Sequence, residues 1–214
     1  MNQARVDNVL SAIYGPSVRV DDVAALGGSD RSKVARVALS GSDAPATVIV
    51  KQADAGEDDS ASEQNRLGLL NDWAGLALLS EAAPNGPWPS FIGGDERNGV
   101  LVLGDLGAVR QMDHVLLGDD PGLARQVLTS YAETLSALHG ACAGRLEWYA
   151  ATRRQLGPER DLQPAAHLHG FRDALARYET VEAKLDQELA ELGRTLEEAG
   201  SLRTYVHGDA CPDN

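Results

Sequence analysis

The chain ends with the stretch Tyr205-Val206-His207-Gly208-Asp209-Ala210-Cys211-Pro212-Asp213-Asn214. Its first residues favour the end of a β-strand, and the glycine and proline that follow favour a loop. On that loop His207, Asp209 and Asn214 have the spacing H-x-D-x-x-x-x-N. A carboxylate can accept a proton from a hydroxyl group, and a carboxamide oxygen can bind a metal ion. The stretch therefore predicts a reactive loop at the end of a strand, and the preceding residues indicate which fold surrounds it.

The composition argues against several classes of protein. The chain has 214 residues, 43% of them hydrophobic, which is enough for one domain or two small lobes with cores of their own. A net charge of −13 argues against a nucleic-acid-binding protein and favours a cationic partner or simple solubility. No apolar run approaches the ~20 residues of a membrane helix, so we expect no membrane partner. With two cysteines and no signal-peptide pattern, we expect a cytoplasmic protein.

The first hundred residues alternate between helix and strand patterns. In chain order, the patterns predict a helix over 3–14, strands over 18–26, 33–39 and 46–52, a helix over 61–82, and strands over 91–95 and 99–104. Because short polar turns separate the first three strands, we expect them to form an antiparallel meander.

The turn Gly27-Gly28-Ser29 between the first two strands admits two interpretations. Small residues let backbone N–H groups approach a phosphate group, and the hydroxyl of Ser29 could add a donor. The same residues are also typical of an ordinary hairpin turn. Two adjacent glycines alone favour the ordinary turn.

Lys51 follows the apolar run 47–50 and so ends a strand that we expect to be buried. A lysine there either extends into solvent or meets an anion. On the helix over 61–82, Asp72 lies within a stripe formed by Leu69, Leu76 and Leu79, where a carboxylate needs a cation. Lys51 is the natural partner for Asp72, although Glu63, earlier on the helix, is a rival.

The character of the sequence changes at Gly104-Asp105-Leu106-Gly107, with strands before it and helices after it. We therefore expect a sheet lobe over 1–103, a hinge over 104–107 and a helical lobe over 108–214. A crossover bracketed by glycines suits a hinge whose backbone faces a flat ring, and it equally suits an ordinary loop.

Helix patterns dominate the second half of the chain. They cover 112–117, a helix that Asp120 caps and Pro121 begins, and the segments 146–156 and 171–199, before a strand over 202–206. On the helix that begins at Pro121, the residues that line one apolar face are Val127, Leu128, Tyr131, Leu135 and Leu138.

The spacing of the terminal motif would arise by chance in about one chain in seventy of this composition, so its setting decides its weight. A sheet with a glycine turn, a strand lysine, a helix with a carboxylate, a hinge and a helical lobe precede it, which is the order of protein kinases. The motif His207-Gly208-Asp209, followed by Pro212-Asp213-Asn214, resembles the catalytic-loop motif of the aminoglycoside phosphotransferase and choline kinase family. The resemblance implies an α+β fold of protein-kinase type, with an antiparallel N-terminal sheet carrying one main helix and a mostly helical C-terminal lobe.

The resemblance also implies a role for each matching residue. Asp209 would be the catalytic base that deprotonates the acceptor hydroxyl, Asn214 would bind Mg²⁺, and Lys51 would hold the α- and β-phosphates of ATP. Asp72 would stand where the family has glutamate. The remaining cofactor-binding residues would be Gly27, Gly28 and Ser29 in the turn, and Leu103, Gly104, Asp105 and Leu106 facing the adenine ring.

The expected activity is transfer of the γ-phosphate of ATP to a hydroxyl group of a small molecule, which could be aminoglycoside-like, an amino alcohol or a sugar. A cationic acceptor would suit the acidic composition. The family's second metal-binding aspartate follows the catalytic loop, so we expect this chain to be a C-terminally incomplete form of a longer kinase with little turnover. The alternative is a non-catalytic or truncated nucleotide-binding or regulatory protein with the same fold.

Overall fold

The computed structural model describes residues 1–29, 31–108, 112–157 and 183–198. These residues belong to two compact units, and each is described by itself. The residues up to 157 lie in the first unit, which contains the sheet and every described helix except α7 (Ala183–Glu198). Helix α7 lies in the second unit and falls within the helix predicted over 171–199. The rest of that prediction, and the strand predicted over 202–206, lie outside the described residues.

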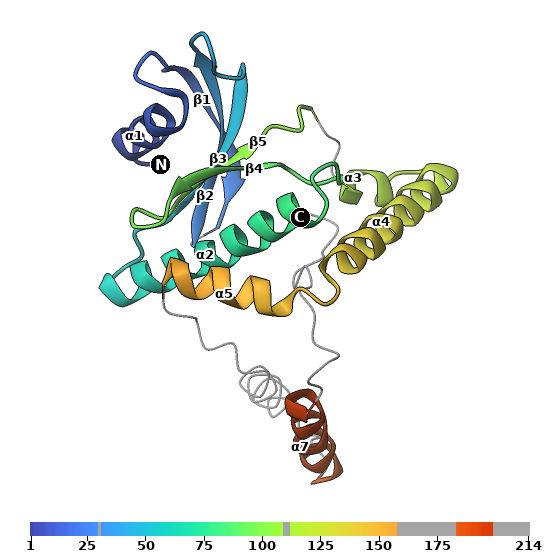
Figure 1. The fold of residues 1–214 in the computed structure, drawn as a ribbon. Helices are drawn as coiled ribbons and strands as arrows, with labels where there is room; N and C mark the ends of the chain where they lie inside the picture. Colours follow the sequence, from blue (N-terminus) through green and yellow to red (C-terminus); the bar gives the residue numbers. More distant parts are fainter. Residues whose placement is uncertain (30, 109–111, 158–182, 199–214) are drawn as a thin grey trace. The chain divides into compact units, whose positions relative to one another are not determined.

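The first unit is built on one antiparallel sheet of five strands (Figure 1). The strands are β1 (Arg19–Gly28), β2 (Ser32–Ser40), β3 (Thr47–Ala53), β4 (Phe91–Asp95) and β5 (Val100–Gly104). Their order across the sheet is β1-β2-β3-β5-β4, and every neighbouring pair is antiparallel. All five predicted strands and the expected meander are confirmed. The mixed α+β fold class, with an antiparallel sheet and a helical part, is confirmed as well.

Helix α1 (Gln3–Tyr14) covers one face of the sheet. Successive residues of a strand point to opposite faces, so Val48 and Val50 of β3 face α1, and both are fully buried. The apolar cluster between α1 and the sheet consists of Val6, Val9, Leu10, Val37, Leu39, Val48, Val50, Val100 and Val102. Burial of these nine side chains is the main force that holds α1 on the sheet.

Helix α2 (Asp59–Ala82) lies against the opposite face. The Asp58 side chain caps it by accepting a hydrogen bond of 2.7 Å from the backbone N–H of Ala61. The ring of Trp73 on α2 packs against the ring of Phe91 on β4, and the two ring centroids are 5.3 Å apart. Gly94 is required at this contact, because a Cβ atom there would lie 2.7 Å from the Trp73 ring and closer still to the carbonyl oxygen of Val100.

The predicted stripe on α2 is partly confirmed. Leu69 and Leu79 are buried, whereas Leu76 is half-buried. The buried face is wider than the stripe, and its other members are Leu67, Leu70, Ala74, Gly75 and Leu78. A wider face is needed because α2 packs on the sheet and on later helices as well.

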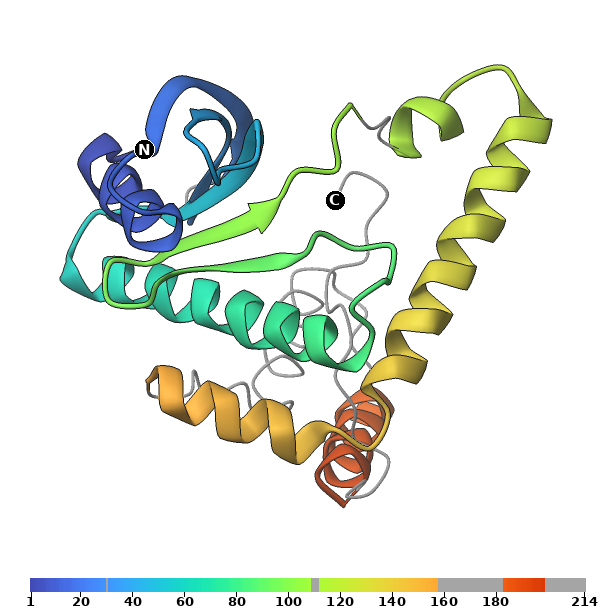
Figure 2. The same ribbon diagram turned by 45° about the horizontal axis from the view of Figure 1, so that its top comes forward.

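Three helices follow the sheet in the first unit: α3 (Met112–Leu116), α4 (Pro121–Cys142) and α5 (Leu146–Leu156). Figure 2 shows α2 between the strands β4 and β5 on one side and α5 on the other. As predicted, Asp120 caps α4, and its carboxylate accepts hydrogen bonds of 2.9 and 3.0 Å from the N–H groups of Gly122 and Leu123. The end of α4 packs on α2 through Leu138 and Cys142.

The predicted apolar face of α4 is buried only at its C-terminal end. Of its five members only Leu138 is buried, and the side chain of Leu128 is 48% exposed. Periodicity identifies the apolar side of a helix, but burial also needs a neighbouring element, and only the C-terminal end of α4 packs on α2. Among the described residues, no helix is long and apolar enough to cross a membrane.

Candidate functional site

Lys51 and Asp72 form an ion pair on the sheet face that α2 covers. Because Val50 and Gln52 face α1, the intervening Lys51 faces α2, and its Nζ lies 2.7 Å from Oδ2 of Asp72. The side chain of Lys51 is 31% exposed and that of Asp72 is 42% exposed. Such a pair contributes only about 0–1 kcal/mol to stability. Asp72 orients the ammonium group of Lys51, and this group is still accessible to solvent. Lys51 can therefore bind an anionic ligand.

Glu63, the rival partner for Lys51, is occupied elsewhere. Its carboxylate accepts hydrogen bonds of 2.8 Å from Nε and 2.6 Å from Nη2 of Arg66, one turn further along α2. The same guanidinium group lowers the pKa of Glu63. Of the two acids weighed as partners for Lys51, the structure therefore selects Asp72, and the shorter aspartate side chain reaches the ammonium group.

The turn Gly27-Gly28-Ser29 joins β1 to β2 at the same end of the sheet as Lys51. Lys51 pairs with Val34 of β2, and the next row of the sheet contains Gly28. The φ angles of Gly27 and Gly28 are 133° and 145°, which favour glycine. The hydroxyl of Ser29 accepts a hydrogen bond of 3.2 Å from the N–H of Arg31. Gly27 and Gly28 are thus the last two residues of β1, paired with Val34 and Lys33, and Ser29 begins the connection to β2. Contact with a phosphate stays a prediction.

The hinge begins where β5 ends. The Gly104 N–H donates to the carbonyl oxygen of Ser90 at 2.9 Å, and the Leu106 side chain is 56% exposed. The Asp105 side chain turns into the protein and is 6% exposed. The expected contact of the backbone at Asp105 with a ring stays a prediction. The Asp105 carboxylate binds Arg36, whose guanidinium group holds the pKa of Asp105 well below its usual range. The backbone of the hinge, rather than the Asp105 carboxylate, is therefore what a ligand could meet.

Half-buried apolar side chains connect the hinge to Lys51 on one face of the sheet. Leu103 of β5 pairs with Ile49 of β3, and Val34 of β2 lies beside Lys51. The strip formed by Val34, Ile49 and Leu103 thus has the hinge at one end and the ammonium group of Lys51 at the other. A ligand with a flat apolar part and an anionic part matches this arrangement.

The sequence comparison adds a family to this geometry. Residues 25–214 match the model of the phosphotransferase enzyme family, a range that includes strands β2 to β5, the end of β1 and the terminal motif. The chain belongs to the phosphotransferase enzyme family. No curated protein matches the chain. Phosphotransferase activity in general is what membership implies.

The structure does not describe two of the predicted site residues, Asp209 and Asn214, nor the motif residue His207. Their roles stay predictions. In the part of the chain that the structure describes, no group of three or more His, Cys, Asp and Glu side chains is arranged to hold a metal ion. The predicted division into a sheet lobe, a hinge and a helical lobe also stays a prediction.

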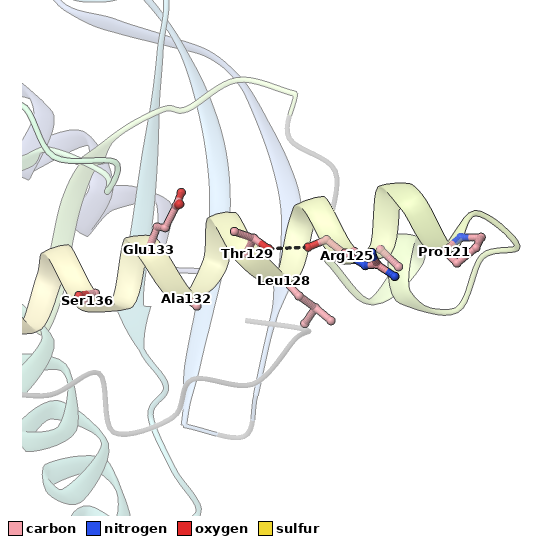
Figure 3. A pocket seen from close by; sticks show the side chains of 8 residues that line it. Pro121, Arg125, Leu128, Thr129, Ala132, Glu133 and Ser136 are labelled. Carbon is pink, nitrogen blue, oxygen red and sulfur yellow. Dashed lines mark hydrogen bonds between the residues drawn. The ribbon is translucent and has the colours of Figure 1, made fainter.

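A shallow apolar groove lies on α4 (Figure 3). Its lining residues are Pro121, Ala124, Arg125, Leu128, Thr129, Ala132, Glu133 and Ser136. The Thr129 hydroxyl donates to the carbonyl oxygen of Arg125 at 2.9 Å, within the helix itself. None of the predicted site residues that the structure describes lines the groove.

Two arginines near the site were missed by sequence reasoning. Arg36 lies on the interior of β2, where a charged residue among apolar ones was the available signal. Arg153 of α5 is 2% exposed, and its Nε donates to Oδ1 of Asn71, the neighbour of Asp72, at 2.6 Å. Its Nη2 also donates to the carbonyl oxygen of Leu67 on α2. No local pattern indicates that contact, because α5 and α2 are more than sixty residues apart in the chain.

Proposed function

We propose that the protein transfers the γ-phosphoryl group of ATP to a hydroxyl group of a small molecule. The observation that carries the proposal is the Lys51–Asp72 pair, with Nζ and Oδ2 2.7 Å apart. The pair stands at the end of a half-buried apolar strip in a chain of the phosphotransferase enzyme family. An oriented cation next to an apolar strip suits the phosphates and the base of a nucleotide.

In this proposal each group of residues has one task. Lys51 binds the α- and β-phosphates, and Asp72 fixes the direction of its ammonium group. The backbone over 103–106 meets the adenine ring, and the turn Gly27-Gly28-Ser29 lies over the phosphates. Phosphoryl transfer needs positioning and charge neutralisation more than covalent chemistry, so these tasks are the larger part of the catalysis.

The reacting groups of the proposal lie on the terminal motif. The acceptor oxygen forms a bond to the γ-phosphorus, and the bond between that phosphorus and the β–γ bridging oxygen breaks to release ADP. Asp209 receives the proton of the acceptor hydroxyl. Asn214 is the proposed ligand of Mg²⁺, which would neutralise phosphate charge when bound.

The proposed acceptor is a small hydroxyl compound, and its classes are aminoglycoside-like molecules, amino alcohols and sugars. The net charge of −13 favours a cationic acceptor over an anionic one and argues against nucleic acid as a partner. The alternative, a nucleotide-binding protein without activity, was favoured in part by the short side chain of Asp72. Because that side chain reaches Lys51, this reason for the alternative no longer holds.

A kinase assay tests the proposal. The full-length protein is incubated with ATP, Mg²⁺ and a panel of aminoglycosides, amino alcohols and sugars, and ADP release is measured alongside the melting temperature. We expect ATP with Mg²⁺ to raise the melting temperature, because a ligand that binds only the folded state stabilises it. We also expect one acceptor class to raise ADP release, and Asp209→Asn to abolish that increase. An unchanged melting temperature, or activity that survives Asp209→Asn, would contradict the proposal.

A further inference from the structure

Arg36 is a charged residue in the interior of β2, on the sheet face that carries Lys51. Its guanidinium group makes two nearly parallel hydrogen bonds to Asp105, from Nε to Oδ2 at 2.7 Å and from Nη2 to Oδ1 at 3.0 Å. Nη2 also donates to the carbonyl oxygen of Gly107 at 2.7 Å. A single side chain of the sheet therefore binds both a side chain and the backbone of the hinge, 69 and 71 residues away.

The Asp105 carboxylate is held from two sides. Besides the guanidinium group of Arg36 on β2, the backbone N–H of Gly107 donates a hydrogen bond of 2.8 Å to it. Gly107 has a φ of 79°, so the backbone turns back toward the carboxylate at this residue. The pairing of β5 with β3 ends at Gly104. Beyond Gly104, the hydrogen bonds of Arg36 and Asp105 hold the backbone in place of strand pairing.

We propose that Arg36 is a positioning residue for the base-binding end of the site: through Asp105 and Gly107 it fixes the hinge backbone against which the purine of a nucleotide lies. The proposal rests on the proposed function. Two parallel hydrogen bonds between the planar guanidinium and carboxylate groups fix both the distance and the relative orientation of Arg36 and Asp105. An apolar contact at this place would not fix the orientation. The exposed side chain of Leu106 lies between the two fixed residues, Asp105 and Gly107.

The role predicts a division between base binding and phosphate binding. Arg36 contacts the hinge, whereas Lys51 and Asp72 form a separate pair. Loss of Arg36 should therefore weaken the binding of ATP and leave the binding of inorganic tripolyphosphate, which has no base, unchanged. A general loss of structure would weaken both ligands.

The test compares Arg36→Met with a matched control, Arg66→Met. Arg66 binds a carboxylate in the same way, through Nε and Nη2 to Glu63, and also donates to a backbone carbonyl oxygen, that of Glu96 at 3.2 Å. For each protein the KM for ATP, kcat, and the Kd values of ATP and tripolyphosphate are measured. Hydrogen exchange of the amides over 104–107 is followed without ligand, and melting temperatures check the folding of both variants.

For Arg36→Met we expect the Kd and KM for ATP to rise about tenfold, as for the loss of one or two hydrogen bonds to the base, with a smaller change in kcat. The Gly107 amide should exchange faster, and the tripolyphosphate Kd should stay unchanged. Arg36→Lys, which keeps the charge but not the planar fork, should rescue only part of the ATP affinity. Arg66→Met should resemble the wild type in all ligand measurements.

Three results would overturn the inference. An ATP Kd for Arg36→Met equal to that of the wild type would remove the positioning role and leave the proposed function intact. Equal weakening of ATP and tripolyphosphate would show that Arg36 only supports the fold. A wild-type protein that binds tripolyphosphate but shows no preference for ATP would overturn both the inference and the adenine-binding part of the proposed function.

Discussion

Two ion pairs on one face of the sheet differ in how completely they are satisfied. Lys51–Asp72 has a single close contact of 2.7 Å, and both side chains are about one-third exposed or more. In Arg36–Asp105 the carboxylate is 6% exposed and accepts three hydrogen bonds, two from Arg36 and one from the N–H of Gly107. A buried carboxylate that accepts three hydrogen bonds from the protein holds the backbone beside it in place. A half-exposed ammonium group with one partner still has donors for an incoming anion.

This difference indicates different roles for two regions of the sheet face, the region around Lys51 (the Lys51 end) and the region around Asp105 (the Asp105 end). The Lys51 end is open and can bind a charged group at little cost, since little further desolvation is needed. At the Asp105 end the carboxylate is already bound by protein groups, so it can only orient the backbone beside it. Changes at the Lys51 end should therefore alter chemistry without altering stability, whereas changes at the Asp105 end should alter both.

The largest effect is expected from Lys51→Met. Removal of one preorganised donor to developing charge typically costs about 10²–10³-fold in kcat, so we expect kcat/KM for ATP to fall by about 10²-fold or more. The melting temperature should change little, because the pair is half exposed. Lys33→Met is the matched control, since Lys33 forms a surface pair of 3.1 Å with Asp54 and its side chain is 51% exposed. Similar losses in the two variants would remove Lys51 from its proposed role.

Local sequence patterns were sufficient to predict most of the fold. The strands of the sheet and the helices α1 and α2 follow from apolar periodicity and from turn residues, both of which act within a few residues. The cap of α4 at Asp120 is local in the same sense. Burial along α4 was not predictable, because the exposure of Leu128 depends on which elements pack beside it.

The site was predictable only in part, for a related reason. Lys51 and Asp72 were both identified, and the pairing of Glu63 with Arg66 three residues later had a local signal that could have excluded Glu63. The Arg36–Asp105 contact joins residues 69 apart, and no spacing rule connects them. No local pattern therefore indicated that the Asp105 side chain binds Arg36, and the expected contact of the Asp105 backbone with a ring stays a prediction.

A pH series on Asp105→Asn is the next test, with a smaller effect on stability. The pKa of Asp105 in the folded protein lies below its ordinary value of about 4, so the ionised carboxylate stabilises the fold above that pH. The contribution is lost as the pH falls toward the lower folded pKa. We expect the variant to melt about 5 °C below the wild type at pH 7 and the difference to shrink below about pH 4.

Thermal melts at pH 7, 5, 4 and 3 check this expectation. Glu63→Gln is the matched control, because Arg66 also lowers the pKa of Glu63, but the Glu63 side chain is 47% exposed. Its destabilisation at pH 7 should be smaller than that of Asp105→Asn. A difference between wild type and Asp105→Asn that stays constant from pH 7 to pH 3 would show that the ionised carboxylate is not what holds the hinge.

The smallest effect is expected from Ser29→Ala at the open end of the face. In the structure the Ser29 hydroxyl accepts a hydrogen bond from the Arg31 N–H, and the Ser29 N–H donates to Ser32 at 2.8 Å whatever the side chain. The turn should therefore persist, and the KM for ATP should rise by no more than about threefold, the size of one weak neutral hydrogen bond. Gly28→Ala gives the contrast, because its Cβ atom would lie 2.4 Å from the Ser32 carbonyl oxygen. If Ser29→Ala raised the KM more than Gly28→Ala did, the hydroxyl would be a phosphate donor in its own right, and the turn would be more than a hairpin with room at its tip.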